Sequence, residues 1–211
     1  MIELGRSAHC RGVVVDASGA AIEGVLVSPQ SAVRPWLGTF EENVPDAKNT
    51  ETSVTGSDGC FDVVLARGSL LLFKPGYAPL TWIKPQPEAS SDLPLRLTLL
   101  PAGHLRFADI PPDLSSRDVA LHVRWLAASA GRAGYESNEV QLSTQPFRED
   151  FGIFNLPVGE YEVWVWTSDS AGQKTGSDTR PPIDDQPGLS HHWQVRIDAG
   201  ATTRIDVAKG W

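Results

Sequence analysis

The chain has 211 residues, 41% of them hydrophobic, and its 18 basic and 26 acidic side chains give a formal net charge of −8. Such a chain can bury a core, whereas its negative charge and its lack of a Lys/Arg cluster argue against binding to nucleic acid or to an anionic membrane surface. No run approaches about 18 consecutive apolar residues, so we expect no membrane insertion. The 19 Gly and 16 Pro favour turns between short strands, which predicts an all-β fold.

The N-terminal half begins with a predicted β-hairpin. "RGVVVD" has the alternation of a strand, and "AIEGVLVSP" is the predicted return strand. Turns are predicted at four Gly-containing stretches, "ASGA" (17–20), "GSDGCF" (56–61), "ARGS" (66–69) and "KPGY" (74–77). Asp58-Gly59 is the strongest local hairpin signal among them. Short strands between these turns predict a small antiparallel β-sandwich.

A long insertion at residues 31–50 separates two of these strands. It contains Trp36 and Phe40 in "RPWLGTF", and so much apolar surface argues against disorder. Long irregular loops in compact domains are commonly functional, so we consider Trp36 and Phe40 as partner-binding residues. The alternative is that the insertion folds back over an open edge of its own domain.

The C-terminal half repeats the pattern of the first half, although not its residues. A Phe-bearing strand, a Gly-centred turn and an alternating strand occur in both, so that Phe61 corresponds to Phe154 and Leu70 to Tyr161. We therefore predict two tandem β-sandwich domains, residues 1–102 and 103–211. The one plausible short helix is "VALHVRWLAASAGRAGY", yet its first residues alternate like a strand.

The first half resembles the carboxypeptidase regulatory-like domain, a transthyretin-like β-sandwich. The similarity spans residues 10–100 and departs at Leu70, where that family usually has an aromatic residue; the second half resembles the transthyretin/Ig-like fold more loosely. The matching residues are Gly12, Val14, Asp16, Gly19, Ile22, Gly24, Val27, Asp58, Gly59, Phe61, Gly68, Gly76 and Tyr77. The resemblance implies a non-catalytic folding or docking unit.

The resemblance also implies which strand faces are buried, namely those of Val14, Phe61 and Tyr161. Alternation then places Cys10 in the core and Cys60 on the opposite face, so two free thiols are expected. Free thiols and the lack of a secretory leader predict a cytoplasmic protein, with export by another route or a truncated chain left open.

Alternation also places Trp164 and Trp166 on the outer face of the strand "GEYEVWVWTSD", a strand with two apolar faces. Three interpretations remain open. The other domain covers these residues, or they stack on sugar rings in a carbohydrate-binding module, or they anchor a protein partner. We favour protein, either a partner or a second copy of the chain, with polysaccharide as the alternative.

Catalytic motifs are absent from the sequence, and we expect no enzyme activity, cofactor or metal. His191 and His192 are adjacent in a predicted strand, so they point to opposite faces and cannot chelate one metal ion. Intradiol dioxygenases share the transthyretin-like core and form a third, weaker alternative. Their R-P-x-H-x-H motif is not matched, because Arg180 and Pro181 lie too far from the His pair, and only Tyr77 and Tyr135 remain as tyrosine ligands.

Overall fold

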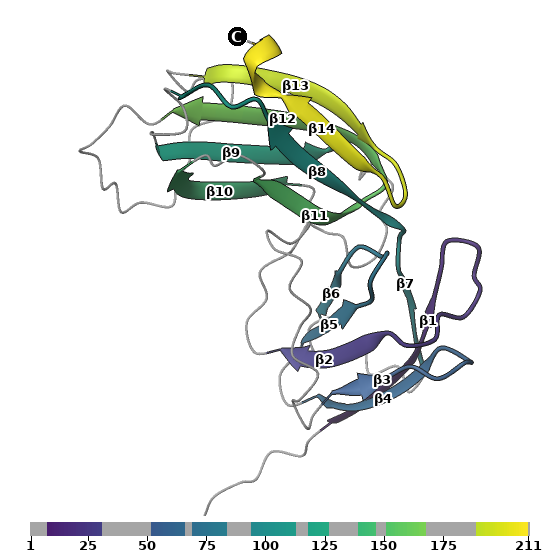
Figure 1. Cartoon of the computed structure of the whole chain (residues 1–211). Coiled ribbons are helices and arrows are strands. Elements are labelled where there is room, and N and C mark those ends of the chain that lie inside the picture. Colours follow the sequence, from purple (N-terminus) through teal and green to yellow (C-terminus); the bar gives the residue numbers. More distant parts are fainter. Residues whose placement is uncertain are drawn as a thin grey trace, which may run out of the picture.

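The structure is a computed structural model that describes residues 8–30, 52–65, 69–83, 94–112, 118–126, 139–146, 151–167 and 189–210 (Figure 1). Its elements are β1 (Ala8–Val15), β2 (Leu26–Gln30), β3 (Ser53–Val54), β4 (Cys60–Leu65), β5 (Ser69–Phe73), β6 (Leu80–Ile83), β7 (Leu95–Thr98), β8 (Ala102–Ala108), β9 (Asp118–Trp125), β10 (Glu139–Pro146), β11 (Gly152–Pro157), β12 (Gly159–Thr167), β13 (Leu189–Ile197), β14 (Thr202–Asp206) and the 3-10 helix η3 (Val207–Gly210). The all-β prediction is confirmed, and the one plausible helix begins as strand β9. No helix in the described ranges is long and apolar enough to cross a membrane.

The described strands form four sheets, and the two halves of the chain have the same strand order. In the first half, the sheet β4-β1-β7 accompanies the sheet β3-β2-β5-β6. In the second half, β11-β8-β14 accompanies β10-β9-β12-β13, which is the first pattern with seven added to every number. Even the parallel pairs correspond, because β1 pairs with β7 and β8 pairs with β14.

The predicted N-terminal hairpin is wrong, although its turn forms. β1 pairs with β4 and β7, whereas β2 lies in the other sheet, and only the isolated bridge Val15↔Ala21 joins the two arms. The chain crosses between the sheets because Ile22 and Val25 are both buried in the core. Thr55 secures the crossing, since its hydroxyl donates to the Ile22 carbonyl and accepts from the Val25 amide.

The core side of each strand is the one predicted by the resemblance. Val14, Phe61 and Tyr161 belong to the buried hydrophobic core, as do Val163 and Val165 on the same side of β12 as Tyr161. Cys10 is buried, Cys60 is exposed, and both are free thiols, which confirms the prediction for the two cysteines.

The segment that joins the two halves runs from β7 into β8 and is hydrogen-bonded to both halves. β7 ends at Thr98 and β8 begins at Ala102, and Figure 1 shows β7 leading directly into β8. On the N-terminal side, the Ala102 amide donates to the Gly76 carbonyl and the Ala78 amide to that of Leu100. On the other side, the Val158 amide donates to the Pro101 carbonyl and the Gly200 amide to that of Ala102. The crossing is therefore held by both halves.

Candidate functional site

The candidate site lies on the sheet β10-β9-β12-β13, on the face opposite to the core. Strand alternation places Glu162 and Trp164 on that face, because Tyr161, Val163 and Val165 occupy the other. The register then aligns Trp164 with His122 of β9 and with His192 of β13. We call the set His122, Arg124, Glu162, Trp164 and His192 the outer-face array.

Trp164 forms the centre of the array. Its ring stacks on that of His122, with the ring centroids 5.0 Å apart, and on that of His192, with centroids 5.1 Å apart. The Arg124 guanidinium lies 4.8 Å from the Trp164 ring centroid, a cation–π contact. Three strands therefore contribute aromatic or cationic groups to one continuous stack.

Glu162 supplies the negative charge of the array. Arg124 donates from Nε to Glu162 Oε2 at 3.0 Å and also from its terminal nitrogen to the same oxygen. The Glu162 side chain is only 15% exposed. Hydrogen bonding from Arg124 lowers the pKa of Glu162, and although burial acts in the opposite direction, the net shift is downward. The carboxylate is thus held in its charged form, paired with Arg124.

The structure places the four sequence-predicted binding residues differently. Trp164 lies on the predicted outer face, but only 5% of it is exposed. Trp166 continues the same strand in register with Ala120 and Leu189, and its side chain is not among those described. Trp36 and Phe40 fall outside the described ranges.

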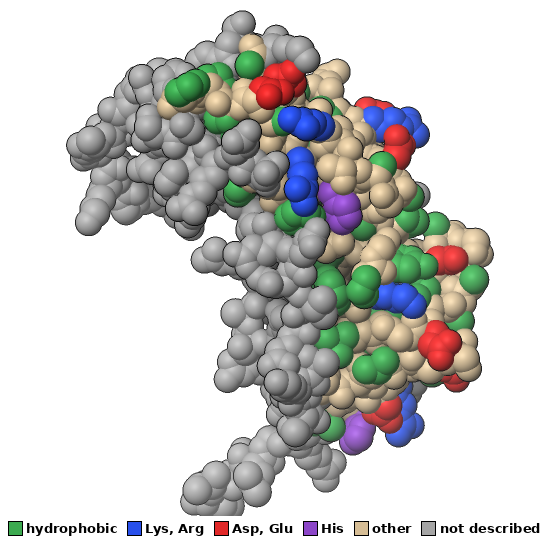
Figure 2. Space-filling view, in the orientation of Figure 1, with side chains coloured by type: hydrophobic (Ala, Val, Ile, Leu, Met, Phe, Trp, Pro, Cys, Tyr) green, Lys and Arg blue, Asp and Glu red, His purple; other side chains and the backbone are tan. Residues whose placement is uncertain are grey.

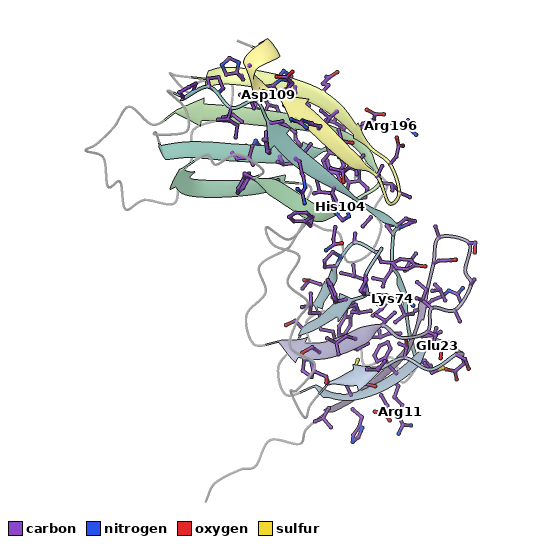
Figure 3. All side chains as sticks on the ribbon, in the orientation of Figure 1. Arg11, Glu23, Lys74, His104, Asp109 and Arg196 are labelled. Carbon is purple, nitrogen blue, oxygen red and sulfur yellow. The ribbon has the colours of Figure 1, made fainter. Side chains whose placement is uncertain are left out.

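The exposed side chains of this face come from β13, and they were not among the binding residues predicted from the sequence. His192, Gln194 and Arg196 are exposed, and Arg196 pairs with Glu160 at 3.3 Å and Asp198 at 3.0 Å (Figure 3). Alternation in "HHWQVRI" shows that these three side chains share a face. It does not show that β13 pairs with β12, which is what brings them beside Trp164.

No group of three or more His, Cys, Asp or Glu that could hold a metal ion occurs among the described residues. The register places His192 beside Trp164 and His191 beside Val165, on opposite faces as predicted. Among the coloured residues in Figure 2, basic and acidic side chains are scattered and form no broad basic patch.

Comparison with known proteins gives only distant structural matches. No family model and no curated protein matches the chain. Three of the matching solved structures are a streptococcal ancillary pilin (16% identity, 94% of this chain and 62% of that one, TM-score 0.26), the Bacillus anthracis TIE protein (12%, 94% and 33%, 0.28) and GBS52, the minor pilin of Streptococcus agalactiae (13%, 95% and 94%, 0.26). The chain thus spans less than two thirds of the first two, and the fold assignment rests on its own strands.

Two predictions made from the sequence are not upheld. The β-sandwich class holds, whereas the specific resemblance to the carboxypeptidase regulatory-like domain is not confirmed. The prediction of a cytoplasmic protein is contradicted, because two of the matched structures are named as pilins, and we withdraw it. Its physical basis was weak, since Cys10 and Cys60 lie on opposite faces of their strands and would stay unbridged in any compartment.

Proposed function

We propose that this chain is a non-enzymatic structural protein, built from two sandwich domains at residues 1–102 and 103–211, that binds a protein partner through the outer face of β9, β12 and β13. The proposed surface includes Trp164 and Trp166, with Trp36 and Phe40 as a second one. The observation that carries the proposal is the outer-face array, because its stacked side chains lie opposite the core and therefore do not serve core packing.

In this proposal, Trp164 holds the neighbouring side chains of the docking surface in place. Stacking between two imidazoles and under Arg124 restricts the side chains around it, and restricted side chains lose less conformational entropy on binding. The exposed groups of His192, Gln194 and Arg196 then make the first contacts. Arg and Trp are also the residue types enriched in the centres of protein interfaces.

The alternatives receive less support from the same geometry. A sugar ring needs an open aromatic face, whereas the Trp164 ring stacks on two imidazoles, contacts Arg124 and is only 5% exposed. The dioxygenase alternative needs free tyrosines and convergent histidines. Tyr161 is fully buried and donates its hydroxyl hydrogen to the Pro157 carbonyl, while His191 and His192 diverge.

A capture experiment with matched surface variants tests the proposal. The baits are the wild type, Trp164→Ala/Trp166→Ala and His192→Ala/Arg196→Ala, each checked for folding by circular dichroism. The control is His9→Ala/Arg11→Ala, which removes the same two residue types from an exposed ion pair with Asp62 on β1 and β4.

The captured protein is then purified, and its affinity for each variant is measured by calorimetry. We expect the β13 variant to weaken binding by at least about tenfold, since truncation of interface anchors costs about 2 kcal/mol or more. The β1 control should bind like the wild type. Equal binding by all variants would show that the outer face is not the docking surface.

A further inference from the structure

The edge of the second sandwich at β13 is the least protected sheet edge in the described part of the chain. β13 has a neighbouring strand on one side only, in the order β10-β9-β12-β13. It is nine residues long, the longest of the edge strands. An exposed edge strand presents unpaired backbone groups, which natural proteins shorten, interrupt or cover.

The other described edges carry such protection. β3 has two residues, and β6 and β7 have four each. β10 and β11 contain register irregularities and end at Pro146 and Pro157. β4 and β14 are five or six residues long and include the carboxylates Asp62 and Asp206. β13 has a register irregularity at its start, between Leu189 and His191, but from His191 to Val195 it has no proline, no further irregularity and no carboxylate.

The open backbone groups on β13 can be assigned from one hydrogen bond. The Arg196 carbonyl accepts from Thr203 Oγ1 on β14 at 2.7 Å, so the backbone of Arg196 points away from β12. Hydrogen-bonding direction alternates along a strand, which means that the backbone groups of Gln194 and His192 also point away from β12. Both residues are exposed.

The charge of this edge suits a second copy of the same chain. With a net charge of −8, two copies of the protein repel each other on average. β13 carries no carboxylate, and its one arginine, Arg196, is already paired with Asp198 and Glu160. Self-pairing at β13 therefore brings no like charges into direct opposition.

We propose that β13 pairs antiparallel with β13 of a second copy, about a two-fold axis at Trp193. This register places His192 opposite Gln194, and it forms about four backbone hydrogen bonds from the outward-pointing groups. A two-fold axis at Gln194 would instead require the Arg196 carbonyl, which Thr203 already occupies. The pairing covers both open edges at once, so the dimer is closed. Its hydrogen bonds use the backbone edge of β13, so the pairing does not depend on the proposed docking function, although His192 and Gln194 also belong to the proposed docking face.

Two double variants test both the pairing and its register. His192→Lys/Gln194→Lys places like charges opposite each other across the two-fold axis, whereas His192→Glu/Gln194→Lys places opposite charges there. Both remove the same two side chains. Sedimentation velocity over a concentration series should show a dimer for the wild type and for the Glu/Lys variant, and self-association weakened by at least about tenfold for the Lys/Lys variant.

A measurement on the wild type makes the test independent of whether the variants fold. Hydrogen exchange at the amides of His192 and Gln194 should slow as the protein concentration rises, while the exposed turn at Ser18 should not change. A wild type that stays monomeric at every concentration overturns the proposal. So does a dimer whose stability is the same in both double variants, because that dimer uses another surface.

Discussion

Tyr161 and Trp164 lie three residues apart on β12 and serve opposite faces of the sheet. Tyr161 is fully buried and donates its hydroxyl hydrogen to the Pro157 carbonyl at 2.6 Å, four residues earlier in the chain. A tyrosine that bonds back to the backbone before its own strand is a recurrent feature of Ig-like sandwiches. Alternation in the sequence correctly places the two residues on opposite faces, but it does not show which face is buried or identify the Pro157 carbonyl and the two imidazoles as partners.

The Tyr161 hydroxyl is expected to stabilise the second sandwich. In Tyr161→Phe the buried Pro157 carbonyl loses its donor, so the free energy of unfolding should fall by about 1–3 kcal/mol. Urea denaturation measures the change. The control is Tyr77→Phe at a half-buried site, where a change within about 0.5 kcal/mol is expected. Equal effects at the two positions would rule out a special role for the Tyr161 hydrogen bond.

Glu162 predicts a pH dependence of stability. Its pKa is lowered in the folded protein, chiefly by hydrogen bonding from Arg124, so its stabilising contribution is complete above its ordinary pKa of about 4.3. That contribution is lost as the pH falls through the lower folded-state value. The wild type should therefore exceed Glu162→Gln in unfolding free energy at pH 7, and this advantage should be smaller at pH 3.

Glu160→Gln is the matched control for this pH dependence. It removes a carboxylate from the same strand, but one whose ion pair with Arg196 is exposed and therefore worth little. Urea denaturation at the two pH values compares the three proteins. A Glu162→Gln deficit that is as large at pH 3 as at pH 7 would mean that the substitution acts through packing and not through the lost charge.

At the scale of elements, turns could be predicted from the sequence more reliably than strand partners. The turn at Asp58-Gly59 forms, with the Asp58 carboxylate accepting from the Cys60 amide, but it joins β3 and β4, which lie in different sheets. Of the four turns predicted from the sequence, only "KPGY" lies between two strands that pair with each other, β5 and β6. Turn residues fix where the chain reverses, whereas the burial of residues such as Ile22 and Val25 decides which sheet it enters.

Gly59 is expected to be indispensable to its turn. Its φ is 73°, and an added Cβ would lie 2.5 Å from the Val14 carbonyl oxygen. Gly76 has a similar φ of 83°, but an added Cβ there meets nothing within 4 Å. Gly76→Ala should therefore cost only about 1–2 kcal/mol for the left-handed conformation. Gly59→Ala should cost clearly more in thermal or urea unfolding, and equal costs would contradict the steric explanation.

At the scale of the whole molecule, a weak pattern in the sequence corresponds to a shared topology. The alignment of Phe61 with Phe154 and of Leu70 with Tyr161 places corresponding residues in β4 and β11 and in β5 and β12. Leu70 and Tyr161 both belong to the core, so their alignment holds at the level of residues. Phe61 and Phe154 do not correspond in this way, because Phe61 is in the core whereas Phe154 lies outside the core cluster and contacts His104 and Arg106. The junction could not be predicted, because its hydrogen bonds join Gly76, Val158 and Gly200, which are distant from Pro101 in the sequence.

The hydrogen-bonded junction predicts that the two proposed domains move as one rigid unit. Its four backbone hydrogen bonds, at 2.8–3.1 Å, connect the Leu100–Ala102 segment to both halves, and each contributes about 1 kcal/mol. Insertion of Gly-Ser-Gly-Ser between Leu100 and Pro101 should separate the bonds to Ala78 from those to Val158. We expect the inserted variant to have a larger radius of gyration by small-angle scattering and faster tumbling of each half by ¹⁵N relaxation. The same insertion in the exposed turn between Ala17 and Ser18 should change neither quantity. If both variants tumble like the wild type, packing outside the junction must hold the halves together, and the crossing strand is not what makes the molecule rigid.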